Sequence, residues 1–263
     1  MKQDVTLFAD ERLDEVNEHL RLIQKKNGLT FGTDAFLLAA YMRAEPRGVA
    51  VELGAGTGII SLLCATRQKF RSIHACEIQE PFAELCVRNA AVNGLSDRII
   101  VHACDLRELS PAAIGREADT VFANPPYMRT DSGKRNEHDE KYIARHEVCG
   151  TVSDFCHAAA RLLKHGGRFY CVWRPDRLCD LMRALEREGL EPKQMTFVHA
   201  HEKAEPSMVL VCAVKGGASS VRISPPLLLQ HSAADKALSD TAALIYEHMS
   251  FEPLWKKDKT TGE

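Results

Sequence analysis

The tetrapeptide Asn124-Pro125-Pro126-Tyr127 is the stretch of this sequence best suited to chemistry, and it directly follows the apolar run 119–123. The two prolines exclude helix, remove two backbone donors and hold the preceding residues in extended geometry. The Asn124 side-chain oxygen and the Pro125 carbonyl can then accept the two hydrogens of a planar NH2 group, while Tyr127 offers a ring face. The structural alternative is a proline-rich turn that ends a strand. The whole tetrapeptide, in a chain with the glycine loop described next, favours a site for an amino group.

The second candidate is a glycine loop formed by Gly54, Gly56 and Gly58, between a predicted strand at 49–53 and a predicted helix at 59–66. Glycine lets the backbone approach a ligand closely, and the N-terminus of the following helix supplies free N–H groups. The third glycine comes one residue too early for the dinucleotide fingerprint G-x-G-x-x-G. We therefore expect S-adenosylmethionine rather than a nicotinamide cofactor.

Three acidic residues follow or end predicted strands and are candidates to contact this cofactor. Glu52, beside the glycine loop, would face the sulfonium and ammonium cations, and a solvated strand-end acid is the alternative. Glu77 lies 23 residues after Gly54, near the offset at which an acid meets ribose hydroxyls. Position alone supports that role. Asp105 would accept the adenine amino group, with the Leu106 N–H reaching a ring nitrogen, although capping the following turn is equally open to Asp105.

Composition restricts the partners of the chain. It has 263 residues and a net charge of −2, from 34 Lys and Arg against 36 Asp and Glu, so a polyanion partner needs a local basic face. The nine cysteines form no Cys-x-x-Cys pair and lie mostly in apolar runs, which favours buried thiols over zinc ligands or disulfides. His199 and His201 have no apparent third ligand, so we expect no metal. No apolar run approaches the ~20 residues of a membrane span, and we expect a cytoplasmic protein.

The elements that must position these residues alternate along the chain. Strands are predicted at 49–53, 72–76, 98–104, 119–123 and 168–173 with helices between them, and two more, at 193–199 and 208–215, are joined directly. This pattern predicts an α/β fold, a Rossmann-like doubly wound sheet of about seven strands with an antiparallel edge strand. Ligands bind such sheets beyond the carboxyl ends of the strands, where the glycine loop, Glu77, Asp105 and Asn124 all fall.

A small hairpin and helix are expected before this sheet. Strands at 19–24 and 29–31 would pair around a turn that contains an Asn-Gly step, after a partly ordered lead-in at 1–18. Asp34 is then expected to cap a helix at 35–42.

The sequence resembles class I S-adenosylmethionine-dependent methyltransferases of the amino-methylating Asn-Pro-Pro-Tyr group, and within it the bacterial tRNA1(Val) adenine-37 N6-methyltransferase family. The resemblance extends from about residue 19 to 215 and is most distinctive at 21–39, with an Ile-Gln step, a basic turn and a Thr-Asp-Ala-x-Leu-Leu-Ala run. We accordingly divide the chain into an N-terminal extension (1–47), a methyltransferase domain (48–216) and a C-terminal appendage (217–263) packed on the same domain.

The resemblance also implies roles for individual residues. Gly54, Gly56 and Gly58 would cradle the methionine end of S-adenosylmethionine, with Thr33 and Asp34 lying over it. Glu77 would bind the ribose hydroxyls, and Asp105 and Leu106 the adenine. Asn124, Pro125, Pro126 and Tyr127 would hold the target base, and Asn124 would border the cofactor as well.

The implied activity is N6-methylation of an adenine in RNA, with adenine 37 of a tRNA anticodon loop as the expected position. The candidate RNA-binding residues are Lys25, Lys26, Arg129, Lys134 and Arg135. Two alternatives stay open. A protein glutamine N5-methyltransferase of the release-factor type uses the same tetrapeptide but carries a longer helical N-terminal domain. A non-catalytic RNA-binding module could use this scaffold too, but the intact glycine loop and Asn124 argue against it.

Overall fold

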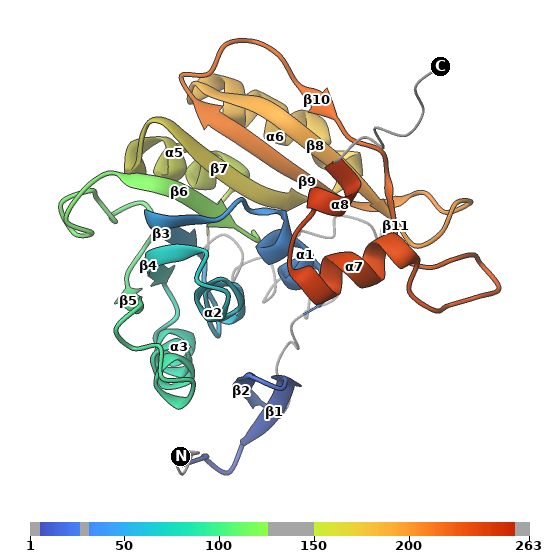
Figure 1. Cartoon of the computed structure of the whole chain (residues 1–263). Coiled ribbons are helices and arrows are strands. Elements are labelled where there is room, and N and C mark those ends of the chain that lie inside the picture. The colour runs from blue at the N-terminus through green and yellow to red at the C-terminus, as the bar shows by residue number, and fades with distance from the viewer. Residues whose placement is uncertain (1–5, 27–31, 126–149, 256–263) are drawn as a thin grey trace, which may run out of the picture.

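A nine-stranded sheet forms the centre of the computed structural model, which describes residues 6–26, 32–125 and 150–255 (Figure 1). The strands run in the order β10-β8-β9-β7-β6-β3-β4-β5, and β11 also pairs with β8. Their bounds are β3 (Glu45–Leu53), β4 (Phe70–Glu77), β5 (Ile99–Ala103), β6 (Ala118–Ala123), β7 (Leu163–Trp173), β8 (Leu190–His199), β9 (Pro206–Lys215), β10 (Arg222–Ile223) and β11 (Leu227–Leu228). The seven long strands, β3 to β9, confirm the predicted α/β sheet.

The antiparallel strand of this sheet is β9, and it lies inside the sheet rather than at its edge. It pairs antiparallel with β7 on one side and with β8 on the other. A short connection from β8 permits only antiparallel pairing. The continuous buried run from Val209 to Ala213 is typical of an inner strand covered on both faces. The edge is instead formed by the short strands β10 and β11, which join β8 in parallel.

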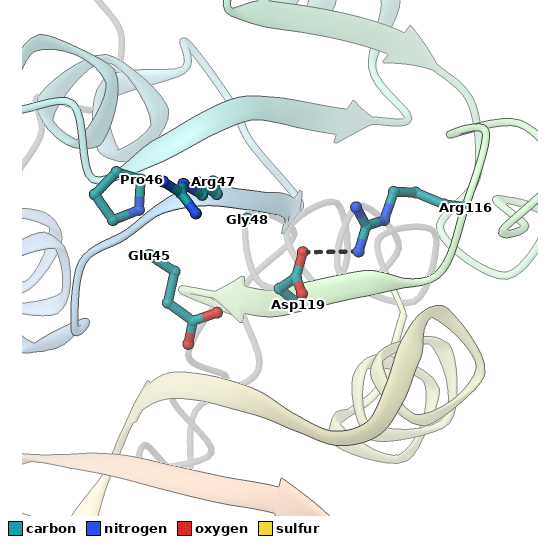
Figure 2. Close-up of a pocket in the computed structure, with 6 residues that line it drawn as sticks. All are labelled: Glu45, Pro46, Arg47, Gly48, Arg116 and Asp119. Atoms are coloured by element: carbon teal, nitrogen blue, oxygen red, sulfur yellow. Dashed lines mark ion pairs between the residues drawn. The ribbon is translucent and has the colours of Figure 1, made fainter.

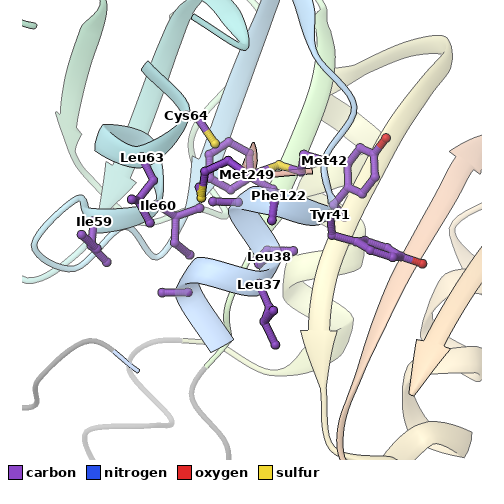
Figure 3. Packing of buried hydrophobic residues seen from close by; sticks show 14 of the residues in the cluster. Leu37, Leu38, Tyr41, Met42, Ile59, Ile60, Leu63, Cys64, Phe122 and Met249 are labelled. Atoms are coloured by element: carbon purple, nitrogen blue, oxygen red, sulfur yellow. The ribbon is translucent and has the colours of Figure 1, made fainter. Parts of the chain in front are cut away.

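Helices cover both faces of the sheet, as a doubly wound fold requires. Their bounds are α1 (Thr33–Tyr41), α2 (Ile59–Thr66), α3 (Glu80–Val92), α5 (Val152–Leu162), α6 (Leu178–Arg187), α7 (Asp240–His248) and α8 (Glu252–Trp255). Buried residues form two hydrophobic clusters, one containing α1, α2, α3 and α7 and the other α5 and α6. Figure 3 shows Leu38 of α1, Ile60 of α2 and Phe122 of β6 in the first cluster. No helix in the described ranges is long and apolar enough to cross a membrane.

The N-terminal hairpin pairs differently from the expectation. Its strands are β1 (Glu11–Asn17) and β2 (Leu20–Lys25), so residues 11–17 are a strand and not a partly ordered lead-in. The turn between them is closed by Asn17, whose Oδ1 accepts the His19 N–H at 2.9 Å. The sequence expectation was wrong because β1 is strongly charged, and three of its charged residues, Glu11, Arg12 and Asp14, are paired within the fold. The expected strand at 29–31 lies outside the described residues.

The side chains of Asn89 in α3 and of Asn93, the C-cap residue of this helix, attach the hairpin to the core. Asn93 accepts the Arg21 N–H and donates to the Arg21 carbonyl, at 2.9 and 2.7 Å. Asn89 makes the same pair of bonds with Ile23, at 2.6 and 3.1 Å, and also donates to the Thr57 carbonyl in the glycine loop at 3.0 Å. These amides take the place of a neighbouring strand at the open edge of β2. The hairpin is therefore bonded to the same helix and loop that border the predicted cofactor site.

The C-terminal segment packs against α1. Figure 1 shows α7 beside α1, where the rings of Phe36 and Tyr246 stack with their centroids 4.5 Å apart. Tyr41 meets Phe251 and Trp255 edge-on, at 5.1 and 5.4 Å. Aromatic pairs in this geometry contribute about 0.5–1.5 kcal/mol beyond the area they bury. The segment thus forms part of the wall that supports α1.

The cysteines occupy the environments that their apolar neighbours predicted. The eight within the described residues are free thiols, and six of them are buried. Burial raises the pKa of the Cys64 thiol to about 12, so that side chain stays protonated and behaves as a small apolar group. Within those same ranges, no three His, Cys, Asp or Glu side chains are grouped as metal ligands.

Candidate active site

The glycine loop follows β3 and leads into α2 in a conformation that requires glycine. Gly54, Gly56 and Gly58 have φ values of +71°, +56° and +82°, in the left-handed region that other residues rarely adopt. A Cβ on Gly58 would also collide with the Cys86 sulfur. By contrast, a Cβ on Gly56 would meet nothing within 4 Å, so the backbone of Gly56 has open space beside it. This geometry fits a backbone cradle for a cofactor.

Glu77 ends β4 and holds the glycine loop in place. Its Oε2 accepts the Gly56 N–H at 2.8 Å and its Oε1 accepts the Gln79 N–H at 2.9 Å. Only 4% of Glu77 is exposed. Each carboxylate oxygen has two acceptor positions, so these two bonds leave capacity for the ribose hydroxyls. Ribose binding by Glu77 stays a prediction, and the hydrogen bond to the glycine loop is a further role that the structure shows.

Glu52 lies beneath the loop and contacts α2. Its Oε2 accepts the Ser61 N–H at 3.1 Å and also the Ser61 hydroxyl. Burial raises the pKa of Glu52 to about 8 despite these bonds, so the side chain is mostly neutral at pH 7. A cation close by would favour the carboxylate again. The expected contact with the cofactor cations stays a prediction, and the observed contact is with the first turn of α2.

Asp105 follows β5 and caps the next turn, which is one of the two roles that the sequence left open. Its Oδ1 accepts the Arg107 N–H at 2.9 Å, and its carboxylate pairs with the Arg107 guanidinium. This pairing lowers the pKa of Asp105. Leu106 is buried, and its carbonyl accepts the Arg161 guanidinium at 2.8 Å. Adenine binding by Asp105 and Leu106 stays a prediction.

Asn124 follows β6 and is bonded to Asp34 on α1. The Asn124 Nδ2 donates to the Asp34 Oδ2 at 2.9 Å. The expectation that Asp34 caps α1 was wrong, because α1 begins at Thr33 with Gly32 in the cap position and no side-chain cap bond. Asp34 and Asn124 are 90 residues apart, and sequence spacing held no signal for their contact. Pro125 is buried at the end of the same strand, whereas Pro126 and Tyr127 lie outside the described residues.

Thr33 lies in the first turn of α1, the helix that packs against α7 through the Phe36–Tyr246 stack. Burial raises the pKa of Tyr246. Thr33 is exposed and Asp34 half-buried. The implied position of both residues over the methionine end of the cofactor stays a prediction.

Both candidate RNA-binding lysines in the described residues are bonded within the fold, and Lys25 is paired with acids. Lys25 pairs with Asp10 at 2.9 Å and with Glu11 at 3.4 Å, which raises the pKa of Lys25. Lys26 donates to the Ala9 carbonyl at 2.9 Å. Arg129, Lys134 and Arg135 lie outside the described residues.

Sequence reasoning missed an aromatic residue beside these lysines. Phe8 is 51% exposed, with the Arg88 guanidinium 4.5 Å and the Lys25 ammonium 5.9 Å from its ring centroid. Arg88 also pairs with Glu11 at 2.7 Å. We call Phe8, Lys25, Lys26 and Arg88 the hairpin patch. Its only sequence signal was an aromatic residue in an otherwise polar lead-in.

A pocket at the opposite end of the sheet is unrelated to these residues. Figure 2 shows its lining, which comes from the start of β3 and from the segment that leads into β6. Arg116 and Asp119 form an ion pair across 3.3 Å within it. Ligands of doubly wound sheets bind at the carboxyl ends of the strands, and this pocket lies at the amino ends.

A doubly wound sheet with a glycine loop after its first core strand and Asn-Pro after its fourth is the framework of a class I methyltransferase. The model of the methyltransferase small domain family matches residues 25–188, and the chain belongs to this family.

Two relatives carry the same name, tRNA1(Val) (adenine(37)-N6)-methyltransferase. The protein from Phocaeicola vulgatus is 33% identical over 180 residues, which cover 68% of this chain and 74% of the relative. The protein from Porphyromonas gingivalis is 31% identical over 217 residues and 80% of each chain. These findings confirm the resemblance seen in the sequence.

Solved structures show the same fold at lower identity. A predicted O-methyltransferase from Agrobacterium tumefaciens superposes with a TM-score of 0.65 at 22% identity, covering 83% of this chain and 97% of that one. TYW2 of P. horikoshii in complex with MeSAdo superposes at 0.55 and 16% identity, over 79% of this chain and 72% of that one.

Proposed function

We propose that the chain transfers the methyl group of S-adenosylmethionine to N6 of an adenine in tRNA, and that this adenine is position 37, next to the anticodon. One observation carries the proposal. Leu53 and Ala123 are register partners on the neighbouring strands β3 and β6, so Gly54 and Asn124 leave the sheet side by side. The cofactor loop and the amino-group site therefore meet at one edge of the sheet. The names of the relatives indicate which nucleotide is the target, adenine 37.

The exocyclic amine of adenine is a poor nucleophile because its lone pair is delocalised into the ring. In the proposed site the Asn124 Oδ1 and the Pro125 carbonyl accept its two hydrogens, which favours a pyramidal nitrogen and directs the lone pair along the line of attack. Bound S-adenosylmethionine supplies an electrophilic methyl group. The N–C bond forms as the S–C bond breaks, S-adenosylhomocysteine leaves, and the extra proton passes from nitrogen to solvent. Positioning is the main contribution of the protein.

The target adenine has to leave its stack to reach Asn124. A base in a single-stranded loop is splayed out at less cost than one in a duplex, which favours an anticodon loop. The hairpin patch is our candidate for contact with the RNA, since an exposed ring beside cations suits both base stacking and phosphate. It is coupled to the site through Asn89, which bonds both Ile23 of β2 and Thr57 of the glycine loop. A cytoplasmic location fits this substrate.

The test is labelled methyl transfer into separated total RNA and total protein from a strain that lacks the gene. We expect label in the tRNA fraction, as N6-methyladenosine. Label in protein as methylglutamine would replace this proposal with the release-factor type of activity. Binding of S-adenosylmethionine in calorimetry with no transfer to either fraction would leave only the non-catalytic scaffold.

A further inference from the structure

The contact between Asp34 and Asn124 fixes which side of the Asn124 amide faces the substrate. An ionised carboxylate has no hydrogen to donate and can only accept. The atom of Asn124 that lies 2.9 Å from the Asp34 Oδ2 must therefore be the NH2 nitrogen. A flipped amide would place two oxygen acceptors against each other. Asp34 thus selects the orientation in which Oδ1 points away from α1.

This orientation is the one that the chemistry requires. A target NH2 group has only hydrogens to offer in the plane of its ring, so an amide presenting its own NH2 would repel it. A charged acceptor on Nδ2 also polarises the amide and strengthens Oδ1 as an acceptor. The same contact therefore favours both the direction and the strength of the acceptor.

Gly32 makes room for the Asp34 carboxylate. A Cβ at position 32 would lie 2.6 Å from the Asp34 Oδ1. The backbone of Gly32, with φ −109° and ψ −179°, is extended and open to any residue. Space for the carboxylate, and not backbone conformation, is thus the reason for glycine here.

The helix that carries Asp34 is anchored at both ends. At its C-terminal end the buried Lys69 ammonium donates to the carbonyls of Ala39, Ala40 and Met42, at 2.7, 3.3 and 2.7 Å. In its N-terminal half the Phe36 ring stacks on the Tyr246 ring of α7, with the centroids 4.5 Å apart. Asp34 is presented from a fixed element, as positioning of a reactive group demands.

We propose that Asp34 is a positioning residue for the reaction: it holds the Asn124 carboxamide with Oδ1 toward the target amine. Glycine at position 32 leaves the space that the Asp34 carboxylate occupies. The inference rests on the proposed function in that Asn124 is taken to accept the target amine. It assigns Asp34 to the methyl acceptor side of the site, whereas the family resemblance placed it over the cofactor.

The test compares single-turnover methylation of tRNA at saturating S-adenosylmethionine with cofactor affinity measured by calorimetry. Asp34→Ala should lower the rate about 10- to 100-fold, less than loss of an acceptor that touches the substrate, for which ~10²–10³-fold is typical. Cofactor affinity should stay within a few-fold. Asp34→Asn, which keeps the size and one acceptor oxygen, should retain more activity than Asp34→Ala.

Gly32→Ala should displace the Asp34 carboxylate from Asn124 without changing a charge. It should lower the rate in the wild-type background but add nothing in the Asp34→Ala background, because the clash then has no carboxylate to act on. A readout independent of turnover is the Asn124 side-chain NH2 signal in a 15N NMR spectrum. Asp34→Ala and Gly32→Ala should both shift this signal, because the first removes the carboxylate partner of the Asn124 amide and the second displaces it.

Asp240→Ala is the matched control. Asp240 also lies in the first turn of a nine-residue helix, and its side chain is 97% exposed, with His231 as its ion-pair partner at 3.8 Å. This variant therefore reports the loss of an acid at a helix N-terminus away from Asn124. It should leave the rate unchanged. Cofactor affinity reduced more than tenfold in Asp34→Ala, with an unchanged rate at saturation, would overturn the inference and return Asp34 to the cofactor. An inactive wild-type protein would instead refute the proposed function.

Discussion

At the scale of single residues, the site is organised by acidic side chains that accept hydrogen bonds from backbone and amide N–H groups. Glu77 holds Gly56, Glu52 holds Ser61 and Asp34 holds Asn124. Each acid connects an element of the sheet edge to a loop or helix of the predicted crevice. Hydrogen bonds contribute about 1.5–3 kcal/mol when one partner is charged and about 0.5–1.5 kcal/mol when both are neutral, as for Glu52 at pH 7. Each contact is therefore strong enough to favour one local conformation.

Replacement of Glu77 should weaken cofactor binding. Glu77→Ala removes the acceptor of the Gly56 N–H and the proposed acceptor of the ribose hydroxyls. We expect S-adenosylmethionine to bind more weakly by about 1.5–3 kcal/mol. Calorimetry measures this, with circular dichroism to verify folding. Unchanged affinity in a folded variant would place the ribose elsewhere.

Glu52 predicts a pH dependence of stability. Its pKa is about 8 in the folded protein, against 4.5 for the ordinary side chain, so the folded state holds one proton more than the unfolded state between these values. The stabilising contribution of the neutral acid is full below pH 4.5 and is lost as the pH rises to 8, by about 1.4 kcal/mol per pH unit. Urea unfolding from pH 5 to 8 should show this decline relative to Glu52→Gln, which does not titrate. Parallel curves for the two proteins would contradict the raised pKa.

At the scale of elements, among the residues that the structure describes, two asparagines rather than a third strand bond the outer edge of β2. Asn89 and Asn93 satisfy the open edge of β2, and only Asn89 also reaches the glycine loop through Thr57. Asn93, the C-cap residue of α3, lies one helical turn after Asn89, which makes the two residues a natural comparison.

Removal of either amide should loosen the hairpin, but only one should affect the cofactor. Asn89→Ala and Asn93→Ala each leave backbone groups of β2 without their partner, which costs about 1–3 kcal/mol. Hydrogen exchange at residues 20–25 should accelerate in both. S-adenosylmethionine affinity should fall in Asn89→Ala and stay unchanged in Asn93→Ala. Equal affinities in the two variants would remove the proposed link between hairpin and loop.

Elements with local signals could be predicted from the sequence, and contacts between distant residues could not. The core strands and the glycine loop carry their own apolar patterns and turn residues. The strand β1 carries no such local signal, because Glu11 in it is stabilised by Arg88, 77 residues away. The Asp34–Asn124 bond spans 90 residues, so Asp34 was interpreted from its neighbours alone, as a helix cap. The inner position of β9 likewise depends on which strands it joins in space.

At the scale of the whole molecule, a net charge of −2 leaves RNA binding to a local surface. The hairpin patch combines an exposed ring with three basic side chains. Two of these are paired with acids, Lys25 with Asp10 and Glu11 and Arg88 with Glu11. Phe8 and Lys26 should therefore contribute more to RNA affinity than Lys25 does. Phosphate contacts also make the affinity fall steeply with salt.

Changes in the patch should weaken RNA binding and spare the cofactor. Phe8→Ala removes a stacking surface worth ~1–3 kcal/mol per base in comparable sites, and Lys26→Glu reverses a charge. The control is Arg71→Glu, a charge reversal at the exposed start of β4, at the opposite end of the sheet. Filter binding of tRNA at several salt concentrations should show weaker binding and, for Lys26→Glu, a shallower salt dependence. Equal losses with Arg71→Glu would indicate a general charge effect and not a binding patch.

Nucleoside mass spectrometry of tRNA treated with S-adenosylmethionine and either the wild-type protein or Asn124→Ala tests the central claim most directly. The wild-type protein should produce N6-methyladenosine next to the anticodon. Asn124→Ala should produce it ~10²–10³-fold more slowly, with cofactor affinity within a few-fold of wild type. Methylation of tRNA by Asn124→Ala at the wild-type rate, or no methyladenosine with the wild-type protein, would contradict the account.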